Sequence, residues 1–211
     1  SLAMICLLLT AGGCGKRSGT TGSGVIATEE RDLSDFEFVQ LVGDGMIDIK
    51  IGPSAKARLT LDDNLLTNIT TRIEGPLLII RPTGGISSGN RLQVELTTPS
   101  LSGVALEGGG LLSTGPFNSA TFLIRITGAG KIVTRGTTES LEIKISGGGE
   151  IDATRLLARD VNITIVGSGK VDLHATNQVA AKITGTGQIR YSGNPQEVHR
   201  SISGDGSIAA R

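Results

Sequence analysis

A Gly-x-Gly motif recurs through the second half of the chain at nearly constant spacing. Successive pairs lie 20, 19, 20, 18 and 19 residues apart. A further pair with the same local pattern, Gly43/Gly45, stands outside this series. Repetition at a fixed period indicates an architecture in which each unit buries its apolar face only by stacking on its neighbours. The pairs of the series are Gly108/Gly110, Gly128/Gly130, Gly147/Gly149, Gly167/Gly169, Gly185/Gly187 and Gly204/Gly206.

Aliphatic residues repeat in columns around these pairs. Two residues before the first glycine stand Leu106, Ile126, Ile145, Ile165, Ile183 and Ile202. Two residues after the second glycine stand Leu112, Ile132, Ile151, Val171, Ile189 and Ile208. A third column, four residues before the first glycine, is aliphatic until Arg200 breaks it in the last copy. Period-two alternation, as in residues 141–145, is typical of a half-buried strand. Each unit therefore predicts a strand, a bend, a strand and a polar connection.

Units of this length predict an all-β fold, a parallel β-solenoid of the β-helix kind. At about 3.3 Å per residue, one coil has a perimeter of roughly 60 Å, and coils about 4.8 Å apart would align the columns inside the tube. Glycine at each bend is expected to supply a positive φ or a close backbone approach. A sandwich or a propeller is the competing interpretation. Propeller blades need about 40 residues and aromatic signatures, whereas this chain has four Phe, one Tyr and no Trp.

Residues 25–105 are also β-rich but less regular. Apolar runs predict strands at 36–39, 47–51, 58–61, 77–80 and 92–96, separated by Gly, Pro, Asp and Asn turns. No window shows a helical period. This region is expected to form either the first coils or a β layer that caps the solenoid. No linker separates it from residues 106–211, so a single domain is predicted.

The N-terminus has the features of a secretory signal. The apolar run at residues 2–9 would span about 12 Å as a helix, far less than a bilayer core of roughly 30 Å. Small residues and Cys14 follow it, and this ending resembles a bacterial lipobox. We therefore predict a lipoprotein signal peptide at 1–13, lipidation of Cys14, a flexible Gly/Ser/Thr-rich tether at 14–24, and a lipid anchor in the bacterial cell envelope. The alternative is that residues 2–9 form a buried strand or helix and Cys14 is a free thiol.

Composition argues against several classes of function. Lys+Arg and Asp+Glu number 20 each, so no net field attracts nucleic acid. The shortage of aromatic rings argues against a base-stacking platform. Both cysteines, Cys6 and Cys14, precede the expected mature domain. That domain would have no disulfide, no thiolate metal site and no cysteine nucleophile.

Two glycine-rich patterns could carry chemistry but have simpler explanations. Residues Gly85–Gly89 formally match G-x-S-x-G. A nucleophile elbow needs a strand before it and a helix after it, whereas strands are expected on both sides, so a hairpin loop is favoured. Gly-x-Gly can bind phosphate where it opens a helix, but here each copy joins two strands.

Polar clusters are similarly open to two interpretations. Calcium at Asp44 or at Asp62-Asp63-Asn64 is weighed against solvated turns, which we favour. His174 and His199 have no neighbouring residue at ligand spacing. Asp152 and Asp172 fall in equivalent repeat positions, which would bring their carboxylates within about 5 Å of each other and could support acid–base chemistry. A solvated strand face gives the same spacing. No catalytic residue, metal ligand or cofactor is therefore predicted.

The recurring Ile-x-Gly-x-Gly-x-Ile motif, the ending formed by Ile189–Pro195 and Ser201–Ile208, and the segment Leu96–Leu101 together carry a family resemblance. They resemble the head GIN domain family of putative auto-transporter adhesins over about residues 30–211. The resemblance implies a cell-envelope domain of repeating β structure and offers no catalytic residues to transfer. This chain departs from the family pattern by having Gly or Ala in the middle of three bends.

These observations lead us to expect a non-enzymatic envelope lipoprotein whose solenoid surface binds polysaccharide or protein. One alternative is a carbohydrate-active enzyme on a β-helix scaffold, with Asp152, Asp172 and neighbouring basic residues in a cleft. Another is a purely structural envelope or oligomerisation protein, which an exposed apolar face would favour. The oligomeric state is left open.

Overall fold

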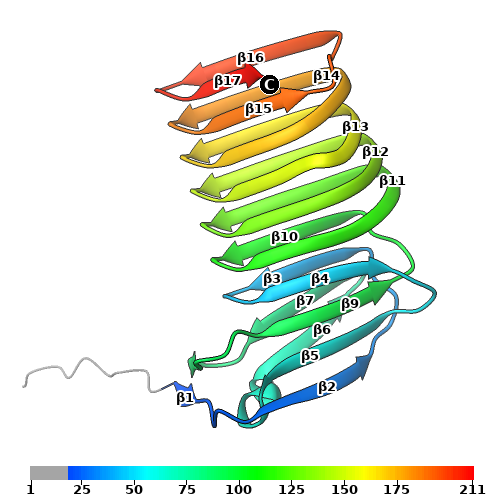
Figure 1. Ribbon diagram of the computed structural model, residues 1–211, viewed down its shortest axis with the longest axis vertical. Coiled ribbons are helices and arrows are strands. Elements are labelled where there is room, and N and C mark those ends of the chain that lie inside the picture. The colour runs from blue at the N-terminus through cyan, green and yellow to red at the C-terminus, as the bar shows by residue number, and fades with distance from the viewer. Residues whose placement is uncertain (1–18) are drawn as a thin grey trace, which may run out of the picture.

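The computed structural model describes residues 19–211, and its main body is a stack of parallel β coils (Figure 1). The predicted signal peptide 1–13 and the lipidation site Cys14 lie outside the described residues. The mixed region that precedes the stack forms one end of it, and the last coil forms the other. The prediction of a parallel β-solenoid is confirmed.

Each coil is one long strand that passes from one sheet to the other. The series opens with β10 (Gly103–Gly108) and continues through β11 (Leu111–Gly128), β12 (Lys131–Gly147), β13 (Glu150–Gly167) and β14 (Lys170–Gly185). The last coil is divided into β15 (Gln188–Ser192) and β16 (Glu197–Ser203), and β17 (Ser207–Ala210) follows. We call the two faces of the stack sheet 1 and sheet 2. Sheet 1 contains β10, the second halves of β11–β14 and β16, and sheet 2 contains the first halves of β11–β14 with β15 and β17. A coil begins in sheet 2, turns at a rounded edge, runs back in sheet 1 and ends at a Gly-x-Gly bend.

The predicted aliphatic columns form in register inside the stack. Leu106 pairs with Ile126, which pairs with Ile145, and the column continues to Ile183. Leu106, Ile126 and Ile183 are fully buried. Burying a side chain of this size contributes about 1.5–3 kcal/mol, and each isoleucine is covered only because a coil lies on either side of it.

The first glycine of each bend is required for its backbone conformation. Every first glycine in the series has φ between +115° and +130°, a conformation that side chains disfavour. A Cβ on Gly167 would also lie 2.5 Å from the carbonyl oxygen of Gly147 in the preceding coil. These glycines are Gly108, Gly128, Gly147, Gly167, Gly185 and Gly204.

The second glycine of each bend differs from the first, because it has no positive φ and is required for space. A Cβ on Gly169 would lie 2.7 Å from Cγ2 of Ile145. One on Gly187 would lie 2.8 Å from Cγ2 of Ile165, and one on Gly206 would lie 2.7 Å from Cγ2 of Ile183. The expectation of a positive φ therefore does not extend to these positions, and close approach is their role. They are Gly110, Gly130, Gly149, Gly169, Gly187 and Gly206, and a Cβ on Gly130 would overlap the side chain of Leu106.

The outlying pair Gly43/Gly45 is the first bend of the stack. It joins β3 (Phe38–Val42), which pairs with β10, to β4 (Met46–Ile51), which pairs with β11. A Cβ on Gly108 would lie 2.7 Å from the carbonyl oxygen of Gly43. The N–H of Leu111 donates a hydrogen bond of 2.8 Å to the carbonyl of Gly45. About fifty residues separate this first bend from the strand that stacks on it, because β4 ends at Ile51 and β10 begins at Gly103.

The remaining strands of the N-terminal region cap the stack. The region as a whole therefore supplies both the first bend and a cap. Sheet 1 is extended by β7 (Leu77–Pro82) and β6 (Ile69–Glu74), and sheet 2 by β9 (Gln93–Thr98), β5 (Lys56–Asp62) and β2 (Ile26–Asp32). The outer pairs, β6 with β7 and β2 with β5, are antiparallel. The 3₁₀ helix η1 (Asp63–Asn68) places Leu65 and Leu66 in the core. Among residues 19–211 no helix is long or apolar enough to cross a membrane.

At the opposite end of the stack, a cation lies over an aromatic ring. The Arg200 guanidinium lies 5.5 Å from the centroid of the Tyr191 ring and donates a hydrogen bond to its hydroxyl. Tyr191 is buried, whereas Ile202 of the last coil is 44% exposed because no further coil covers it. An inward-facing charge on a terminal strand discourages pairing with another edge. The break in the third column at Arg200 thus marks the end of the stack.

Differences in coil length are absorbed at the rounded edge. Strands β11, β12, β13 and β14 contain 18, 17, 18 and 16 residues. Their register shifts lie between Ser113 and Pro116, between Val133 and Arg135, between Ala153 and Leu157, and between Ala158 and Asp160. The bends themselves stay in register, as Gly147 with Gly167 and Gly167 with Gly185 show.

The bend geometry predicts that Gly167→Val destabilises the protein by about 3 kcal/mol or more, because a β-branched residue is strained at this φ and its Cβ meets the preceding coil. Thermal or urea denaturation followed by circular dichroism measures the loss. The control is Ser168→Val, an exposed position in the same bend. Equal midpoints for Gly167→Val and the unmodified protein would contradict the role of this glycine.

Candidate binding surface

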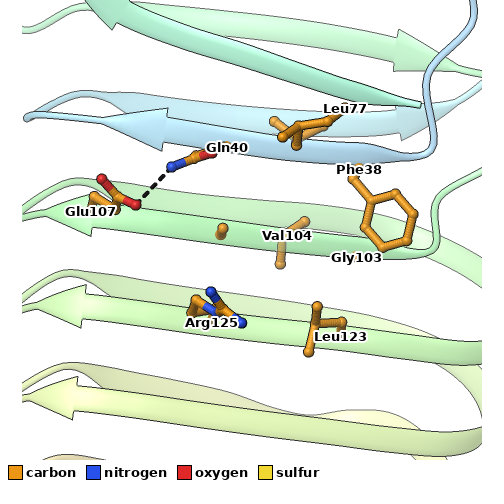
Figure 2. Close-up of a pocket in the computed structure, with 10 residues that line it drawn as sticks. Phe38, Gln40, Leu77, Gly103, Val104, Glu107, Leu123 and Arg125 are labelled. Carbon is orange, nitrogen blue, oxygen red and sulfur yellow. Dashed lines mark hydrogen bonds between the residues drawn. The ribbon is translucent and has the colours of Figure 1, made fainter. Parts of the chain in front are cut away.

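A hollow of about 250 Å³ lies on the outer face of sheet 1 (Figure 2). Its residues come from neighbouring strands in register: Leu77 pairs with Phe38, Phe38 with Gly103, and Gly103 with Leu123. Because Gly103 has no side chain, the column is interrupted between Phe38 and Leu123. Ala105, two residues further along the same strand, is also small, so the depression continues along β10.

The ring of Phe38 lies against the backbone of Gly103. A Cβ on Gly103 would be 2.8 Å from Cδ1 of Phe38 and 2.9 Å from the carbonyl oxygen of Leu123. Gly103 has no positive φ, so its role is to allow this close approach. Phe38 is half-buried, and the rest of its ring forms one wall of the hollow.

Polar groups gather at the end of the hollow away from Phe38. The side-chain amide of Gln40 donates a hydrogen bond of 2.7 Å to Oε1 of Glu107 (Figure 2). The exposed guanidinium of Arg125 lies on the next strand and is in no ion pair within residues 19–211. The hollow therefore combines an apolar wall with an amide, a carboxylate and a guanidinium, which can donate and accept hydrogen bonds.

A second hollow of about 580 Å³ adjoins the first, and Phe38 and Leu123 line both. It is more polar, and the Ser102 hydroxyl donates a hydrogen bond of 3.1 Å to Glu37 within it. Sequence reasoning did not find this surface. The alternation of Phe38, Gly103 and Leu123 marks them as outward-facing, but only the register places them side by side.

The predicted proximity of Asp152 and Asp172 is observed, since they are register partners on sheet 2. Each carboxylate has its own partner, however. Asp152 accepts hydrogen bonds from the N–H and the hydroxyl of Thr154, at 3.1 and 2.7 Å. Asp172 accepts one of 2.7 Å from the guanidinium of Arg190. Burial alone would raise the pKa of Asp152, but these hydrogen bonds and nearby cations, including Lys131, hold that pKa below its ordinary value. A proton donor needs a raised pKa, so this pair does not favour acid catalysis.

Asp62 is buried, which corrects the prediction of a solvated turn. Its Oδ1 accepts hydrogen bonds from the N–H of Gly24 at 2.8 Å and from the amide of Asn90 at 3.1 Å, and its Oδ2 accepts one from the hydroxyl of Ser88. Asp62 thereby fastens two separate segments to β5. Asp63 and Asn64, which follow it, are exposed.

Residues Gly85–Gly89 do not form the predicted hairpin loop. They link β7 of sheet 1 to β9 of sheet 2, and their short strand β8 (Ile86–Ser87) pairs in parallel with β1 (Thr20–Thr21). No helix follows the serines, so the geometry is not that of a nucleophile elbow. The last residues of the predicted tether 14–24 are therefore held against the protein by β1 and by the contact of Gly24 with Asp62.

The remaining candidates lie apart from the hollows of sheet 1. Asp44 accepts a hydrogen bond of 2.9 Å from the N–H of Gly109 in the next bend. Nδ1 of His174 lies 3.2 Å from the hydroxyl of Ser192, and His199 is exposed. Within residues 19–211 no three His, Cys, Asp or Glu side chains come together as a metal site would require.

The family described as "Putative auto-transporter adhesin, head GIN domain" matches residues 35–195. The chain belongs to this family. The match runs from just before β3 to the connection between β15 and β16, so it takes in both hollows of sheet 1. A search of curated proteins found no match to this head GIN domain.

Several solved structures share its fold. A crystal structure of a putative adhesin from Bacteroides fragilis has a TM-score of 0.75 at 20% identity and covers 92% of this chain and all of its own. One of a putative adhesin from Parabacteroides merdae has a TM-score of 0.58 at 20% identity, with 92% and 99% covered. One of a putative lipid binding protein from Parabacteroides distasonis has a TM-score of 0.57 at 22% identity, with 92% and 100% covered. At these identities the likeness shows the fold alone.

The hydrogen bonds to Asp62 predict acid-sensitive stability. The Ser88 hydroxyl, the Asn90 amide and the Gly24 N–H hold the pKa of Asp62 below its ordinary value of 3.8. A carboxyl whose pKa is lower in the folded state stabilises the fold above its unfolded pKa, and this contribution is lost as pH falls through the folded pKa. Asp62→Asn should therefore be less stable at pH 7, and the difference should shrink below about pH 3.8. Urea denaturation from pH 7 to pH 2 measures this, with the exposed Asp205→Asn as control. A difference that stays constant over this range would contradict the assignment.

Proposed function

We propose that this head GIN domain is a non-enzymatic binding module of the bacterial cell envelope, and that it holds polysaccharide on the outer face of sheet 1. The observation that carries the proposal is the hollow between Phe38 and Leu123, with Gln40, Glu107 and Arg125 at its end. Sites for small ligands combine apolar walls with a few convergent polar groups in this way.

A saccharide suits this combination of groups. The apolar face of a sugar ring packs on an aromatic side chain such as Phe38, and its hydroxyls exchange hydrogen bonds with amide, carboxylate and guanidinium groups. The adjoining hollow, with its serine, threonine and asparagine side chains, extends the surface for further sugar residues. The parallel stack supports both hollows on rigid strands, which lowers the entropy lost on binding.

The proposal includes attachment through lipid on Cys14. Cys14 precedes β1 by six residues, so a lipid on Cys14 would be attached near the capped end of the protein. Figure 1 places β1 beside the cap and the last coil at the far end. The coils would then project away from the membrane. The pairing of β1 with β8 supports this arrangement, because it ties the chain to the cap where the tether ends.

A carbohydrate-active enzyme is the second candidate, and the adjacency of Asp152 and Asp172 is the observation in its favour. The lowered pKa of Asp152 weighs against it. A purely structural role would be favoured by a continuous apolar face. Instead, the large exposed apolar side chains of the described region lie on different elements, among them Ile26 in β2, Leu157 and Val166 in β13, and Ile202 in β16.

The site predicts that Phe38→Ser weakens polysaccharide binding roughly tenfold, because the sugar loses its aromatic platform. Ala105→Leu should weaken it similarly by filling the hollow without touching the core. A glycan array identifies a bound polysaccharide, and calorimetry with its oligomers measures the affinity. Val166→Ser, which removes an exposed apolar side chain elsewhere on sheet 1, is the matched control. The proposal would be refuted if Phe38→Ser and Ala105→Leu bound as strongly as the unmodified protein, or if the unmodified protein bound no polysaccharide.

The lipid anchor predicts a defined mass for the mature protein. When the full precursor is expressed in a bacterium with lipoprotein processing, the mature chain should begin at Cys14 and carry acyl groups. Intact mass spectrometry and fractionation of membranes measure this. Cys14→Ser should abolish the acyl mass and release the protein from the membrane fraction. An unmodified Cys14 in a membrane-free protein would contradict the anchor.

A further inference from the structure

A recess of about 390 Å³ opens at the rounded edge of the stack, on the side of sheet 2. It forms where the 17-residue coil β12 lies between the 18-residue coils β11 and β13. The longer neighbours each insert an extra residue at this corner, and the register shifts there on both sides of β12. The shorter coil is therefore set back. Seven of the residues that line the recess carry polar side chains: Ser113, Thr114, Thr134, Arg135, Asp152, Thr154 and Arg155.

Two arginines flank the recess on adjacent coils. Arg135 and Arg155 are register partners, so their Cα atoms lie about 4.8 Å apart. Both side chains are exposed, and neither is in an ion pair within residues 19–211. Nε of Arg135 donates a hydrogen bond of 3.2 Å to the carbonyl of Thr114, which holds this side of the guanidinium in place. The side chain of Arg155 makes no hydrogen bond within the described chain and is free to contact a ligand.

The other polar groups of the recess suit a hydroxylated ligand. Oδ1 of Asp152 is engaged by Thr154, which leaves Oδ2 available as an acceptor. On the floor, the buried hydroxyls of Thr114 and Thr134 lie 3.0 Å apart and satisfy each other. Counting the two arginines against Asp152, the recess has an excess of one positive charge. Val133 is the only large apolar side chain in its lining, so little surface is offered to an apolar group.

We propose that this recess binds the carboxylate of an acidic sugar residue, such as a hexuronate, within a polysaccharide. The guanidiniums of Arg135 and Arg155 would hold the carboxylate, because planar guanidinium groups match carboxylate geometry. The free oxygen of Asp152 would accept a hydrogen bond from a sugar hydroxyl. This inference rests on the proposed function for its class of ligand, but it uses a different surface from the hollows of sheet 1.

A protein carboxylate is the rival occupant, and the lining favours the sugar. An acidic peptide would bring apolar side chains and backbone N–H groups, for which the recess offers one valine and one free carboxylate oxygen. A uronate residue brings one carboxylate and several hydroxyls, which match two guanidiniums and one acceptor.

The test measures binding of oligogalacturonate, of a neutral oligosaccharide of equal length and of an oligoglutamate peptide. Calorimetry on the processed domain is run at low and at physiological salt. Arg155→Gln should weaken oligogalacturonate binding about tenfold, and the double variant Arg135→Gln/Arg155→Gln should abolish it, since a charge-assisted pair is lost at each site. Raising the salt should weaken the unmodified protein's binding to the acidic oligomer. The control is Lys56→Gln/Arg81→Gln, which removes the same net charge from exposed positions in the cap. Because the Arg155 side chain is exposed and makes no hydrogen bond within the described chain, we expect Arg155→Gln to fold as the unmodified protein does.

Five outcomes decide the matter. Loss in the arginine variants but not in the control, with neutral binding unchanged, supports the recess. Equal loss in the control means that net charge alone attracts the oligomer and overturns the proposal, as does equally strong binding in the arginine variants or none in the unmodified protein. Stronger arginine-dependent binding of an oligoglutamate peptide also overturns it in favour of a protein ligand. The sheet 1 proposal is judged separately, by neutral oligosaccharides and Phe38→Ser.

Discussion

The hydrogen-bonded ladder of Gly-x-Gly bends is the constraint on which the rest of this structure depends. The N–H of Ser168 donates to the carbonyl of Gly147 at 3.0 Å, and the N–H of Lys170 donates to that of Gly149 at 2.9 Å. The same pair of bonds recurs at the neighbouring bends. A side chain at either glycine would separate the two backbones and break these bonds. Because the bends stack at the spacing of adjacent strands, the aliphatic columns inside must stack as well.

A fixed register at one edge transfers all variation in coil length to the other. The bends repeat without shifts, whereas the rounded edge contains the bulges around Thr114, Thr134 and Thr154. A solenoid of identical coils would present flat, uniform faces. Here the lack of a side chain at Gly103 and the short coil β12 interrupt that uniformity. Each interruption creates a depression, one with an apolar wall and polar groups at its end, the other lined mainly by polar groups. Both proposed binding surfaces thus arise from local departures from the repeat.

The two ends of the stack are protected by different means. At the N-terminal end, β7 and β9 cover the first coil, and the antiparallel strands and η1 lie beyond them. The buried Asp62 ties the incoming chain to this cap. At the C-terminal end the aliphatic column stops at Arg200, whose cation covers Tyr191. Exposed strand edges invite further pairing, so these devices define a stack of limited length. A domain held at its capped end would expose its coils along their whole length to the surroundings.

The sequence by itself determined the coil, its period and its core. Glycine pairs every 18–20 residues, with aliphatic residues at fixed offsets, leave few other folds, because steric and hydrophobic requirements act locally. Strands β2 and β6 and the helix η1 were not predicted, because they lie in the cap and depend on packing rather than on a repeat. Only the tertiary structure decided that Gly43/Gly45 is the first bend, and that Phe38 faces Gly103 and Leu123. It also decided that Arg135 and Arg155 flank one recess. These relations join residues far apart in the chain through strand register, and the register is set by the whole stack.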